Sequence, residues 1–530
     1  MESTLITRHR GDYLWGSFYL EGADGYIDTR DPATGVVLDT VPWRLGALNA
    51  AVRDAREAGP SWDRTHLQDR LRIVHNLREV LHSRRNELAA MVSREMGKPL
   101  WEARLECIAA VKAIDALLEQ CGRVLAPIPH PSAQGTLRRR PMGTIAVVTP
   151  FPYPIFIPLQ LLLPCLIGGN AVVWKPSSLV PLCSQKVAET FDAAGIPRGV
   201  FSMVTGPRDP VGEALVHHKN VDMIVGAGST ALGDAVRVDT EKPVWAQTGG
   251  KGWAIVCEDA DLDRAAYEVI TSAFLTAGQR CNATSRVLVE DAVSETFLKR
   301  LLALCRELKI MAPTDPECFS GPLVSQDART RFQEHLRAYA EADVECLAGS
   351  LTGSAELPES MRRFGQGYVQ PVVVRLDDGL PPDLTLPEEI EGPLLVTTVV
   401  ERAEEAVAAY NAHPFGLAAS VFSQSSSRAD DLTRNLRAGC VNWNRGTIVA
   451  SARYPNAGLG RSGQGAEGNA ALLLACTWPQ AKLSASGPFD PSHRVPGINW
   501  PAEMELADPT EAVTPPFRPG DDTRIFPVDD

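Results

Sequence analysis

Short apolar runs rich in β-branched residues alternate with stretches of helical periodicity through much of this chain. The first series lies between residues 144 and 233, and each run is short enough to form one buried strand. Its predicted strands are Thr144–Val148, Ala171–Trp174, Phe201–Val204 and Val221–Val225, and its predicted helices are Ile155–Ile167, Ser184–Ala194, Ala214–His217 and a segment after Ser229. Strands joined by helices in this way predict an α/β fold with a doubly wound parallel sheet.

Helical sequence precedes this series, and a second αβ series follows it. From Leu45 to Leu118 apolar residues recur at helical spacing, with charges on the other face. The second series runs from Trp253 to Trp443, and its predicted strands include Ser285–Val289, Val372–Arg375 and Leu394–Val400. A chain of 530 residues has room for about three compact units. We therefore expect a second α/β domain and, in residues 491–530, an extended proline-rich tail.

The balance of charges limits the partners of the chain. Lysine and arginine number 52 against 65 aspartates and glutamates, so the net charge is −13. Such a chain has no overall electrostatic attraction to nucleic acid or to an anionic membrane. The most basic run, Arg138–Arg140, is typical of a solvated strand end. Because 44% hydrophobic and 22% charged residues are usual in globular proteins, we expect a folded, soluble protein that binds neither nucleic acid nor membrane.

Cysteine usage and the N-terminus bear on the compartment. The eleven cysteines are scattered, without a CxxC pair or the Cys/His spacing of a metal site, and their odd number excludes complete internal pairing. Reduced thiols in the cytoplasm fit this usage best. Residues 1–10 lack the apolar core of a secretory signal. The stretch Tyr153–Trp174 is interrupted by prolines, glycines and an asparagine, so it predicts a buried helix and strand rather than a membrane span.

Two segments of the first series have the composition of a phosphate-binding edge. The run Gly226–Gly233 follows a predicted strand and opens a predicted helix, an arrangement whose backbone N–H groups attract phosphate. Such glycine turns are about as often only tight connections. Lys175 ends a predicted strand at the carboxyl edge of the sheet, where open α/β sheets bind ligands. It is placed to contact a ribose hydroxyl, and an ordinary surface lysine is the alternative.

Cys281 differs from the other cysteines in its surroundings. A single cysteine is usually buried and inert. Cys281 instead follows Ala277–Arg280, a run of small and polar residues that is typical of a reactive position. A cysteine attacks as its thiolate, so the site must lower the thiol pKa through a cation, a helix terminus or a base.

Taken in order, these segments resemble the aldehyde dehydrogenase superfamily from Phe18 to Pro479. The matching stretches are Arg94–Pro99, Leu137–Gly143, Lys175–Ser177, Gly228–Ser229, Gly249–Lys251, Gly278–Cys281, Glu389–Pro393, Asn411–Leu417 and Ser462–Gly463. Within the superfamily the chain is most similar to the N-succinylglutamate 5-semialdehyde dehydrogenases, through Lys98–Glu102, Ser272–Cys281 and Ala438–Asn444.

The resemblance implies a mechanism and a cofactor. A thiolate at Cys281 adds to a small aldehyde, the thiohemiacetal passes a hydride to NAD or NADP, and water releases the thioester. The residues that the resemblance places at the cofactor are Thr149, Pro150, Lys175, Ser177, Ser178, Gly228, Ser229 and Glu389. It implies no metal.

Two catalytic positions depart from the family pattern. The family has a glutamate as general base just before a Gly-Gly pair, and here Gln247 stands there, 34 residues before Cys281. An amide takes no proton at neutral pH, and a general base typically supplies about 10²–10⁴-fold. The family's oxyanion asparagine lies in a Pro-x-Asn-x-Pro run, and here that position is Pro152. Loss of one oxyanion donor typically costs about 10²–10³-fold, which the backbone N–H of Cys281 would only partly offset.

Three further departures lie around the same site. Ser178 stands where NAD-preferring relatives often carry a glutamate, so a 2′-phosphate meets less repulsion and NADP is also expected to bind. Glu391 replaces the usual apolar residue of Glu-x-Phe-Gly-Pro, which changes the packing near the nicotinamide. Pro455–Gly458 reads Pro-Asn-Ala-Gly in place of Pro-Phe-Gly-Gly. Lys251 and Lys175 are candidates to act on the thiol in place of the base, by lowering its pKa electrostatically.

The resemblance also implies an architecture. Residues 1–130 and 145–250 would form a Rossmann-type NAD(P)-binding domain, and residues 251–445 an α/β catalytic domain. Residues 131–144 and 446–490 would form bridging strands that pair subunits into a homodimer or homotetramer, which would also cover an exposed sheet edge.

Three functions follow from this combination of features. The first is an NAD(P)-dependent oxidoreductase that uses Cys281 on a small acidic semialdehyde, with hydrolysis that is slow or is assisted by a rearranged base. The second is an acylating or reductive enzyme that exchanges the thioester with CoA or a carrier-protein thiol, because a stronger nucleophile than water needs less base. The third is a cofactor-binding pseudoenzyme, which the residues at 247 and 152 favour and the retained Cys281 opposes.

Overall fold

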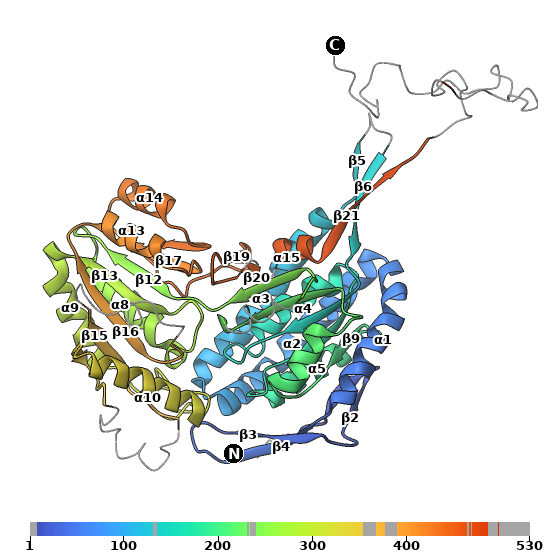
Figure 1. The fold of residues 1–530 in the computed structure, drawn as a ribbon, viewed down its shortest axis with the longest axis horizontal. Helices are drawn as coiled ribbons and strands as arrows, with labels where there is room; N and C mark the ends of the chain where they lie inside the picture. Colours follow the sequence, from blue (N-terminus) through green and yellow to red (C-terminus); the bar gives the residue numbers. More distant parts are fainter. Residues whose placement is uncertain are drawn as a thin grey trace, which may run out of the picture.

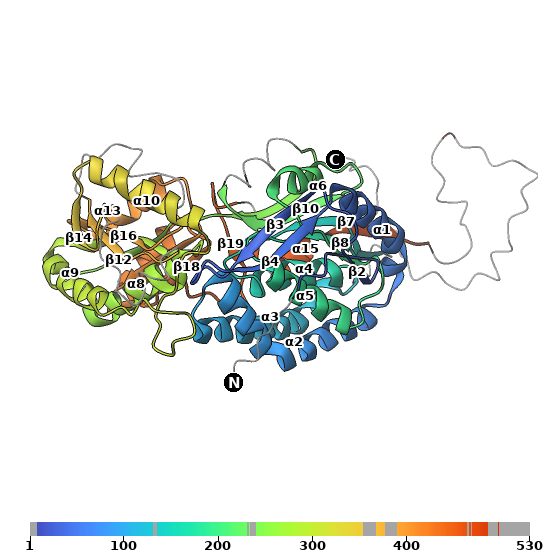
Figure 2. The ribbon, with the colours of Figure 1, turned by 90° about the horizontal axis from the view of Figure 1, so that it is seen from below.

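The computed structural model describes residues 8–130, 135–230, 233, 240–352, 367–376, 390–463, 466–467, 469–485 and 497. The predicted tail, except residue 497, and the predicted cofactor residue Glu389 lie outside these residues. The described chain forms two seven-stranded α/β bodies that lie side by side (Figures 1 and 2). A three-stranded sheet projects from one of them (Figure 1). This is the α/β fold that the sequence predicts.

The first sheet is built around the predicted parallel strands. Its order is β11-β10-β7-β8-β9-β1-β2, and the pairs from β11 to β9 are all parallel. The parallel strands are β7 (Thr144–Val148), β8 (Ala171–Lys175), β9 (Phe201–Met203), β10 (Met223–Gly228) and β11 (Val244–Thr248). Ile145, Val172 and Val225 are fully buried because helices cover both faces of this sheet.

The edge of this sheet differs from the prediction of a purely parallel sheet. Strands β1 (Asp12–Leu14) and β2 (Ser17–Tyr19) form an antiparallel hairpin, and β1 pairs antiparallel with β9. The hairpin turns at Trp15 and Gly16, both of which have positive φ, as a two-residue hairpin turn requires. Asp12 accepts a hydrogen bond from the backbone N–H of Thr205 at 2.7 Å and so fastens the hairpin to the end of β9.

The predicted glycine turn after Val225 also begins later than expected. Gly226 and Gly228 belong to strand β10, and the turn starts at Ser229. The strand continues because Gly226 pairs with β7 on one side and with β11 on the other. Most of the predicted helix after Ser229 lies outside the described residues.

Helices cover the two faces of the first sheet unequally. Helix α1 (Leu45–Arg64) packs on one face with Leu48, Ala51 and Val52 buried. The other face is covered by the long helices α2 (Leu67–Met96) and α3 (Leu100–Leu125) and by α4 (Phe156–Ile167), α5 (Pro181–Ala193) and α15 (Asn469–Ala475). Two short helical segments, η1 (Arg208–Gly212) and α6 (Glu213–His217), follow β9 and precede β10 in the chain.

The second body repeats this layered arrangement. Its sheet has the order β14-β15-β16-β13-β12-β17-β18, and only β14 is antiparallel to its neighbour. Its strands are β12 (Gly252–Val256), β13 (Thr284–Glu290), β14 (Glu345–Ala348), β15 (Val372–Arg375), β16 (Leu394–Val400), β17 (Ala418–Phe422) and β18 (Cys440–Trp443). Helices α8 (Leu262–Phe274) and α9 (Asp291–Arg306) cover one face, and α13 (Ala403–Ala412) and α14 (Ser426–Asn435) cover the other.

Small sheets complete the structure. Strands β5 (Ile128–His130), β6 (Gly135–Pro141) and β21 (Thr477–Leu483) form an antiparallel sheet that projects away from the first body (Figure 1). Strands β3 (Gly25–Arg30) and β4 (Val37–Trp43) form a hairpin, and β19 (Asn456–Ala457) pairs with β20 (Ala466–Glu467). No helix in the described part of the chain is long and apolar enough to cross a membrane.

Candidate active site

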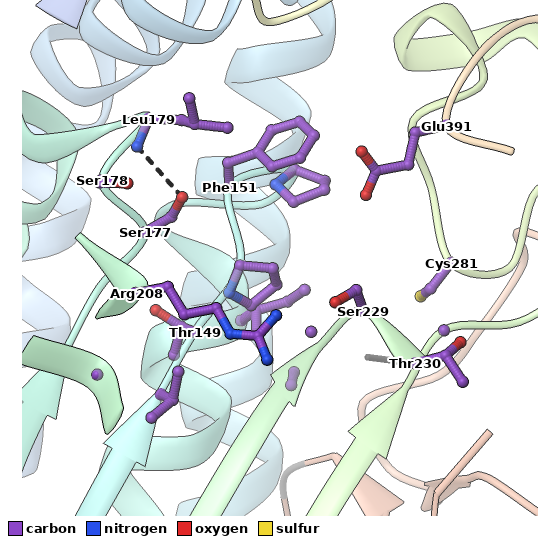
Figure 3. Close-up of a pocket in the computed structure, with 18 of the residues that line it drawn as sticks. Thr149, Phe151, Ser177, Ser178, Leu179, Arg208, Ser229, Thr230, Cys281 and Glu391 are labelled. Carbon is purple, nitrogen blue, oxygen red and sulfur yellow. Dashed lines mark hydrogen bonds between the residues drawn. The ribbon is translucent and has the colours of Figure 1, made fainter. Parts of the chain in front are cut away.

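The carboxyl ends of β7, β8 and β10 open into a cavity of about 760 Å³. Every described residue that the sequence predicts at the cofactor lines it (Figure 3). These residues are Thr149, Pro150, Lys175, Ser177, Ser178, Gly228 and Ser229. Cys281, Gln247, Pro152 and Glu391 line the same cavity, so folding brings together the residues that were predicted at the site from distant parts of the chain.

Lys175 is the buried cation of this cavity. It is the last residue of β8, and its side chain passes Gly212, where a Cβ would lie 3.7 Å from Lys175 Cε. Burial lowers its pKa to about 8, and it forms no ion pair with another described residue. A buried ammonium without a protein counter-ion favours an anionic or hydroxyl-rich ligand.

Hydrogen bonds fix the loops beside Lys175. The indole N–H of Trp174 donates to Thr149 Oγ1 at 3.0 Å, and the backbone N–H of Leu179 donates to Ser177 Oγ at 3.3 Å. Arg208 extends into the cavity from η1 and lies 3.8 Å from Glu213 (Figure 3). The cavity wall therefore combines hydroxyl groups with a second cation.

Cys281 follows a tight left-handed turn at the end of η2 (Leu275–Gly278). Thr276, Ala277 and Gly278 all have positive φ, and a Cβ on Gly278 would lie 2.3 Å from the carbonyl oxygen of Gly392. The turn persists because Arg280 and Glu102, 2.6 Å apart, both hydrogen-bond the Thr276 hydroxyl. Cys281 is half-buried, and its sulfur points into the cavity (Figure 3).

Gly249 and Gly250 bring β11 against the Cys281 loop. Gly249 has φ +59°, and a Cβ on Gly250 would lie only 2.4 Å from the carbonyl oxygen of Cys281. Gln247, three residues earlier, is buried at the end of β11, and neither its Oε1 nor its Nε2 has a hydrogen-bond partner among the described residues. An unpaired buried amide is costly, so this side chain is available to a bound molecule.

A buried ion pair fixes the backbone at Pro152. Its carbonyl oxygen accepts a hydrogen bond of 2.9 Å from Lys98 Nζ, which also lies 2.6 Å from Glu106. The other carboxylate oxygen of Glu106 accepts the backbone N–H groups of Ile155 and Phe156, where α4 begins. This arrangement fixes the loop 150–155, and the sequence analysis assigned Glu106 no role.

Glu391 brings a carboxylate into the cavity. Its side chain is one-third exposed and points toward the cavity centre (Figure 3). Burial raises the pKa of Glu391, and Arg331, 3.8 Å away, opposes that rise. Lys251, the other predicted helper of the thiol, lines a separate cavity of about 30 Å³ with Trp253 and Arg286.

Sequence reasoning missed two parts of the site. One face of α10 (Gln326–Glu341) closes the large cavity with Ala328, Arg331, Phe332 and His335, whose helical spacing was the available signal. A second cavity of about 180 Å³ also reaches Cys281. It is lined by Ala109, Tyr153, Phe156, Ile157, Gln160, Asn282, Ile448, Ala450, Ser451, Ala452, Tyr454 and Asn456.

A third cavity of about 780 Å³ adjoins the second one. The two share Ala109, Phe156 and Ala450–Ala452, and Lys112 and Arg453 line the outer cavity. Arg453 pairs with Glu119, whereas the exposed Lys112 forms no ion pair with a described residue.

All eleven cysteines are free thiols.

Comparison with known proteins identifies the family of this chain. The model of the aldehyde dehydrogenase family matches residues 19–481. The chain is 34% identical to an N-succinylglutamate 5-semialdehyde dehydrogenase of Chromobacterium violaceum over 85% of this chain and 92% of that protein. It is 33% identical to N-succinylglutamate 5-semialdehyde dehydrogenase 1 of Caulobacter vibrioides over 89% and 98% of the two chains.

A solved structure is also similar to this chain. The structure of an NAD-dependent aldehyde dehydrogenase from Sinorhizobium meliloti superposes with a TM-score of 0.84 at 30% identity. The superposition covers 92% of this chain and 97% of the other. The family match extends over the parallel strands of the first sheet, over the second sheet and over Cys281. The chain therefore belongs to the aldehyde dehydrogenase family and is an oxidoreductase of that kind.

Proposed function

We propose that the chain oxidises a small acidic semialdehyde with NAD or NADP, through a thiohemiacetal and then a thioester on Cys281. The observation that carries this proposal is the position of the Cys281 sulfur in the cavity at the strand ends, which the buried Lys175 also lines. The relatives named for N-succinylglutamate 5-semialdehyde support an acidic substrate. Lys112 in the outer cavity forms no ion pair with a described residue, and it supports an acidic substrate because it offers a cation to a carboxylate.

The lining of the large cavity fits a nicotinamide dinucleotide. Lys175 and Arg208 supply cations, Ser177, Ser178 and Ser229 supply hydroxyl groups, and Gly228 ends β10 without a side chain in the way. Glu389 completes the proposed set. When bound, the cofactor supplies an acceptor for the hydride of the substrate.

The protein groups have separate tasks in this reaction. Cys281 forms the carbon–sulfur bond, and the loop 276–280 holds its backbone in place. Gln247 stands at the base position but binds no proton at neutral pH, and Pro152 stands at the oxyanion position without an N–H. Oxidation therefore proceeds to the thioester, and hydrolysis of that thioester is the slow step.

The same observation favours a second function. The unpaired amide of Gln247 leaves water without a base, whereas a thiol such as CoA or a carrier-protein pantetheine attacks a thioester with less help. In that case the acyl group leaves Cys281 on the thiol, or the reaction runs in reverse from a thioester to an aldehyde.

We propose that the two seven-stranded sheets have different functions. Residues 1–130 and 145–250 bind the cofactor around the first sheet, and residues 251–445 carry Cys281 on the second. Residues 131–144 and 446–490 contribute β6 and β21, which we propose as the bridge between subunits of a homodimer or homotetramer. Each edge of this sheet is open to a further strand in the described chain.

Intact-protein mass spectrometry tests the function. The protein is incubated with NAD or NADP and a panel of short semialdehydes, with and without CoA, and Cys281→Ala is the control. We expect an acyl adduct on the wild type alone, together with one equivalent of reduced cofactor. Removal of the adduct by CoA would select the acylating function. Reduced cofactor formed equally by Cys281→Ala would refute a role for Cys281, and silence of both proteins would favour a pseudoenzyme.

A further inference from the structure

Two cavities with otherwise separate linings share three residues. The large cavity at the strand ends and the 180 Å³ cavity have in common Tyr153, Ile157 and Cys281. Of these three, only Tyr153 and Cys281 carry a group that can donate a hydrogen bond. Tyr153 therefore lines, together with the nucleophile, both cavities that reach Cys281.

The residue before Tyr153 provides no donor to the reacting carbonyl. Pro152 has no backbone N–H, and its carbonyl oxygen is engaged by Lys98 at 2.9 Å. Addition of a thiolate to a carbonyl places negative charge on the carbonyl oxygen, and that charge requires a donor in a site that excludes water. The donor must therefore come from another residue than the one at position 152.

Tyr153 is held firmly and its hydroxyl is available. Lys98 Nζ lies 4.0 Å from the centre of its ring and the guanidinium of Arg280 lies 5.3 Å away. The ring of Phe156 meets it edge-on at 6.2 Å. Within the described chain its hydroxyl forms no hydrogen bond, so no protein acceptor competes for its proton.

The phenol keeps its proton at neutral pH. Burial raises the pKa of Tyr153 above its ordinary value, and Arg280 only partly opposes the rise. The negative charges of Glu102, Glu106 and Cys281 raise this pKa further. Tyr153 is therefore a donor and not a base.

We propose that Tyr153 is a catalytic residue whose hydroxyl donates a hydrogen bond to the oxyanion formed when Cys281 adds to the carbonyl. The thiolate of Cys281 forms the carbon–sulfur bond, and the π pair of the carbonyl moves to its oxygen, which accepts the Tyr153 hydrogen bond. When the carbonyl re-forms, the electron pair on oxygen returns to the carbon–oxygen bond and a second bond to carbon breaks. With an ester this is the bond to the alkoxide or phenolate, which leaves with the bonding pair; with an aldehyde it is the C–H bond, whose pair would leave as a hydride to NAD(P) when that cofactor is bound. The inference rests on Cys281 as the nucleophile of the proposed function and is independent of the cofactor.

Two reagents separate oxyanion stabilisation from thiol reactivity. p-Nitrophenyl acetate acylates a thiolate through a tetrahedral oxyanion and releases p-nitrophenolate. Iodoacetamide alkylates the same thiolate by displacing iodide, with no oxyanion. The rate constants of both reactions are measured at Cys281 by peptide mass mapping in the wild type and in Tyr153→Phe. Cys281→Ala gives the background from other thiols, such as the exposed Cys346.

We expect Tyr153→Phe to lower the acylation rate constant about 10²-fold and to leave the alkylation rate constant unchanged. Tyr267→Phe is the matched control, because Tyr267 is an exposed tyrosine of α8, and both of its rate constants should equal those of the wild type. An unchanged ratio of acylation to alkylation in Tyr153→Phe overturns the proposal, and so does a wild type that is alkylated but not acylated at Cys281. Because neither reagent needs NAD(P), failure of the dehydrogenase activity alone leaves this result readable.

Discussion

The ammonium group of Lys98 donates a hydrogen bond of 2.6 Å to the carboxylate of Glu106, and both side chains are fully buried. This pair joins the start of α3 to the loop that carries Pro152 and Tyr153. A buried charge is tolerable only while its partner is present. The loop 150–155 therefore depends on two buried charges, those of Lys98 and Glu106, which are not proposed to contact the substrate.

Replacing one member of this pair should therefore destabilise the protein. We expect Lys98→Met to cost about 3–5 kcal/mol, because Glu106 is left buried and charged, and we expect Lys98→Met combined with Glu106→Gln to recover part of the loss. Thermal unfolding followed by circular dichroism measures this. Lys309→Met removes the exposed pair with Glu317 and should cost about 1 kcal/mol or less. Equal losses for Lys98→Met and Lys309→Met would contradict the prediction.

A carboxylate at position 247 should restore the hydrolytic step. Gln247 is buried in the cavity and has no side-chain hydrogen-bond partner among the described residues, so Gln247→Glu places a carboxyl in a site that raises its pKa toward neutrality. We expect steady-state release of reduced cofactor to rise about 10²-fold and the acyl adduct on Cys281 to disappear. Gln247→Ala removes the amide without adding a base and should stay slow. A persistent adduct in Gln247→Glu would show that position 247 does not limit hydrolysis.

The residue at position 178 should set the preference between the two cofactors. Ser178 lines the cavity, and Ser178→Glu would place a negative charge where the 2′-phosphate of NADP is proposed to lie. We expect the dissociation constant of NADP to rise about 10-fold, and that of NAD to stay within about twofold. Ser178→Gln has the size of glutamate without its charge and is the control. If both variants change NADP binding equally, bulk and not charge is responsible.

Cofactor affinity should depend on pH through Lys175. Burial lowers its pKa to about 8, so the ammonium is charged below pH 8 and loses its proton as the pH rises through that value. An anionic cofactor should therefore bind more weakly at pH 9 than at pH 7. Lys175→Met should bind NAD about 10-fold or more weakly at pH 7 and lose most of this pH dependence. Calorimetric titration with NAD at both pH values measures it, and a wild type that binds equally at both refutes it.

Stability should also depend on pH through Glu95 of α2. This carboxylate is buried, and it accepts the backbone N–H groups of Leu182 and Cys183 at 2.8 and 2.7 Å and the hydroxyl of Thr29. Burial raises its pKa from 4.5 to about 7 despite these hydrogen bonds. The folded state then holds more protons than the unfolded state between pH 4.5 and 7, so the contribution of Glu95 is fully present below pH 4.5 and is lost as the pH rises through 7.

The comparison with Glu95→Gln isolates this contribution, because glutamine does not titrate. The melting temperature of the wild type minus that of Glu95→Gln should be larger at pH 5 than at pH 8. The same difference for Glu57→Gln, an exposed position of α1, should stay constant. A difference for Glu95→Gln that is equal at both pH values would be inconsistent with the raised pKa.

The sequence predicted the buried parallel strands well, because each is a short apolar run with helical sequence on both sides. Strand β7 has the predicted bounds Thr144–Val148, and β8 differs by one residue. The hairpin of β1 and β2 was missed because its turn is Trp15–Gly16, without the Asn-Gly or Asp-Gly signal of such turns.

At the site, motifs identified residues that are close in the chain, and folding supplied the rest. Cys281 and Lys175 stand in recognisable local runs, whereas the contact of Tyr153 with Lys98 and Arg280 joins three distant segments. Lys98 lies in the connection between α2 and α3, and Glu106 lies within α3. Because the two residues do not share one helix, no spacing rule for helices or strands identifies this ion pair. The face of α10 was periodic in the sequence, but periodicity alone does not say that it closes a cavity.

The two cavities that meet at Cys281 also have a consequence for timing. Their linings are separate except for Tyr153, Ile157 and Cys281, so two reactants need not pass through the same space. The space at the strand ends can be vacated and refilled while an acyl group stays on Cys281 and the smaller cavity remains occupied. The fate of the acyl group is then a competition between the lifetime of the thioester and the arrival of the next molecule in that space.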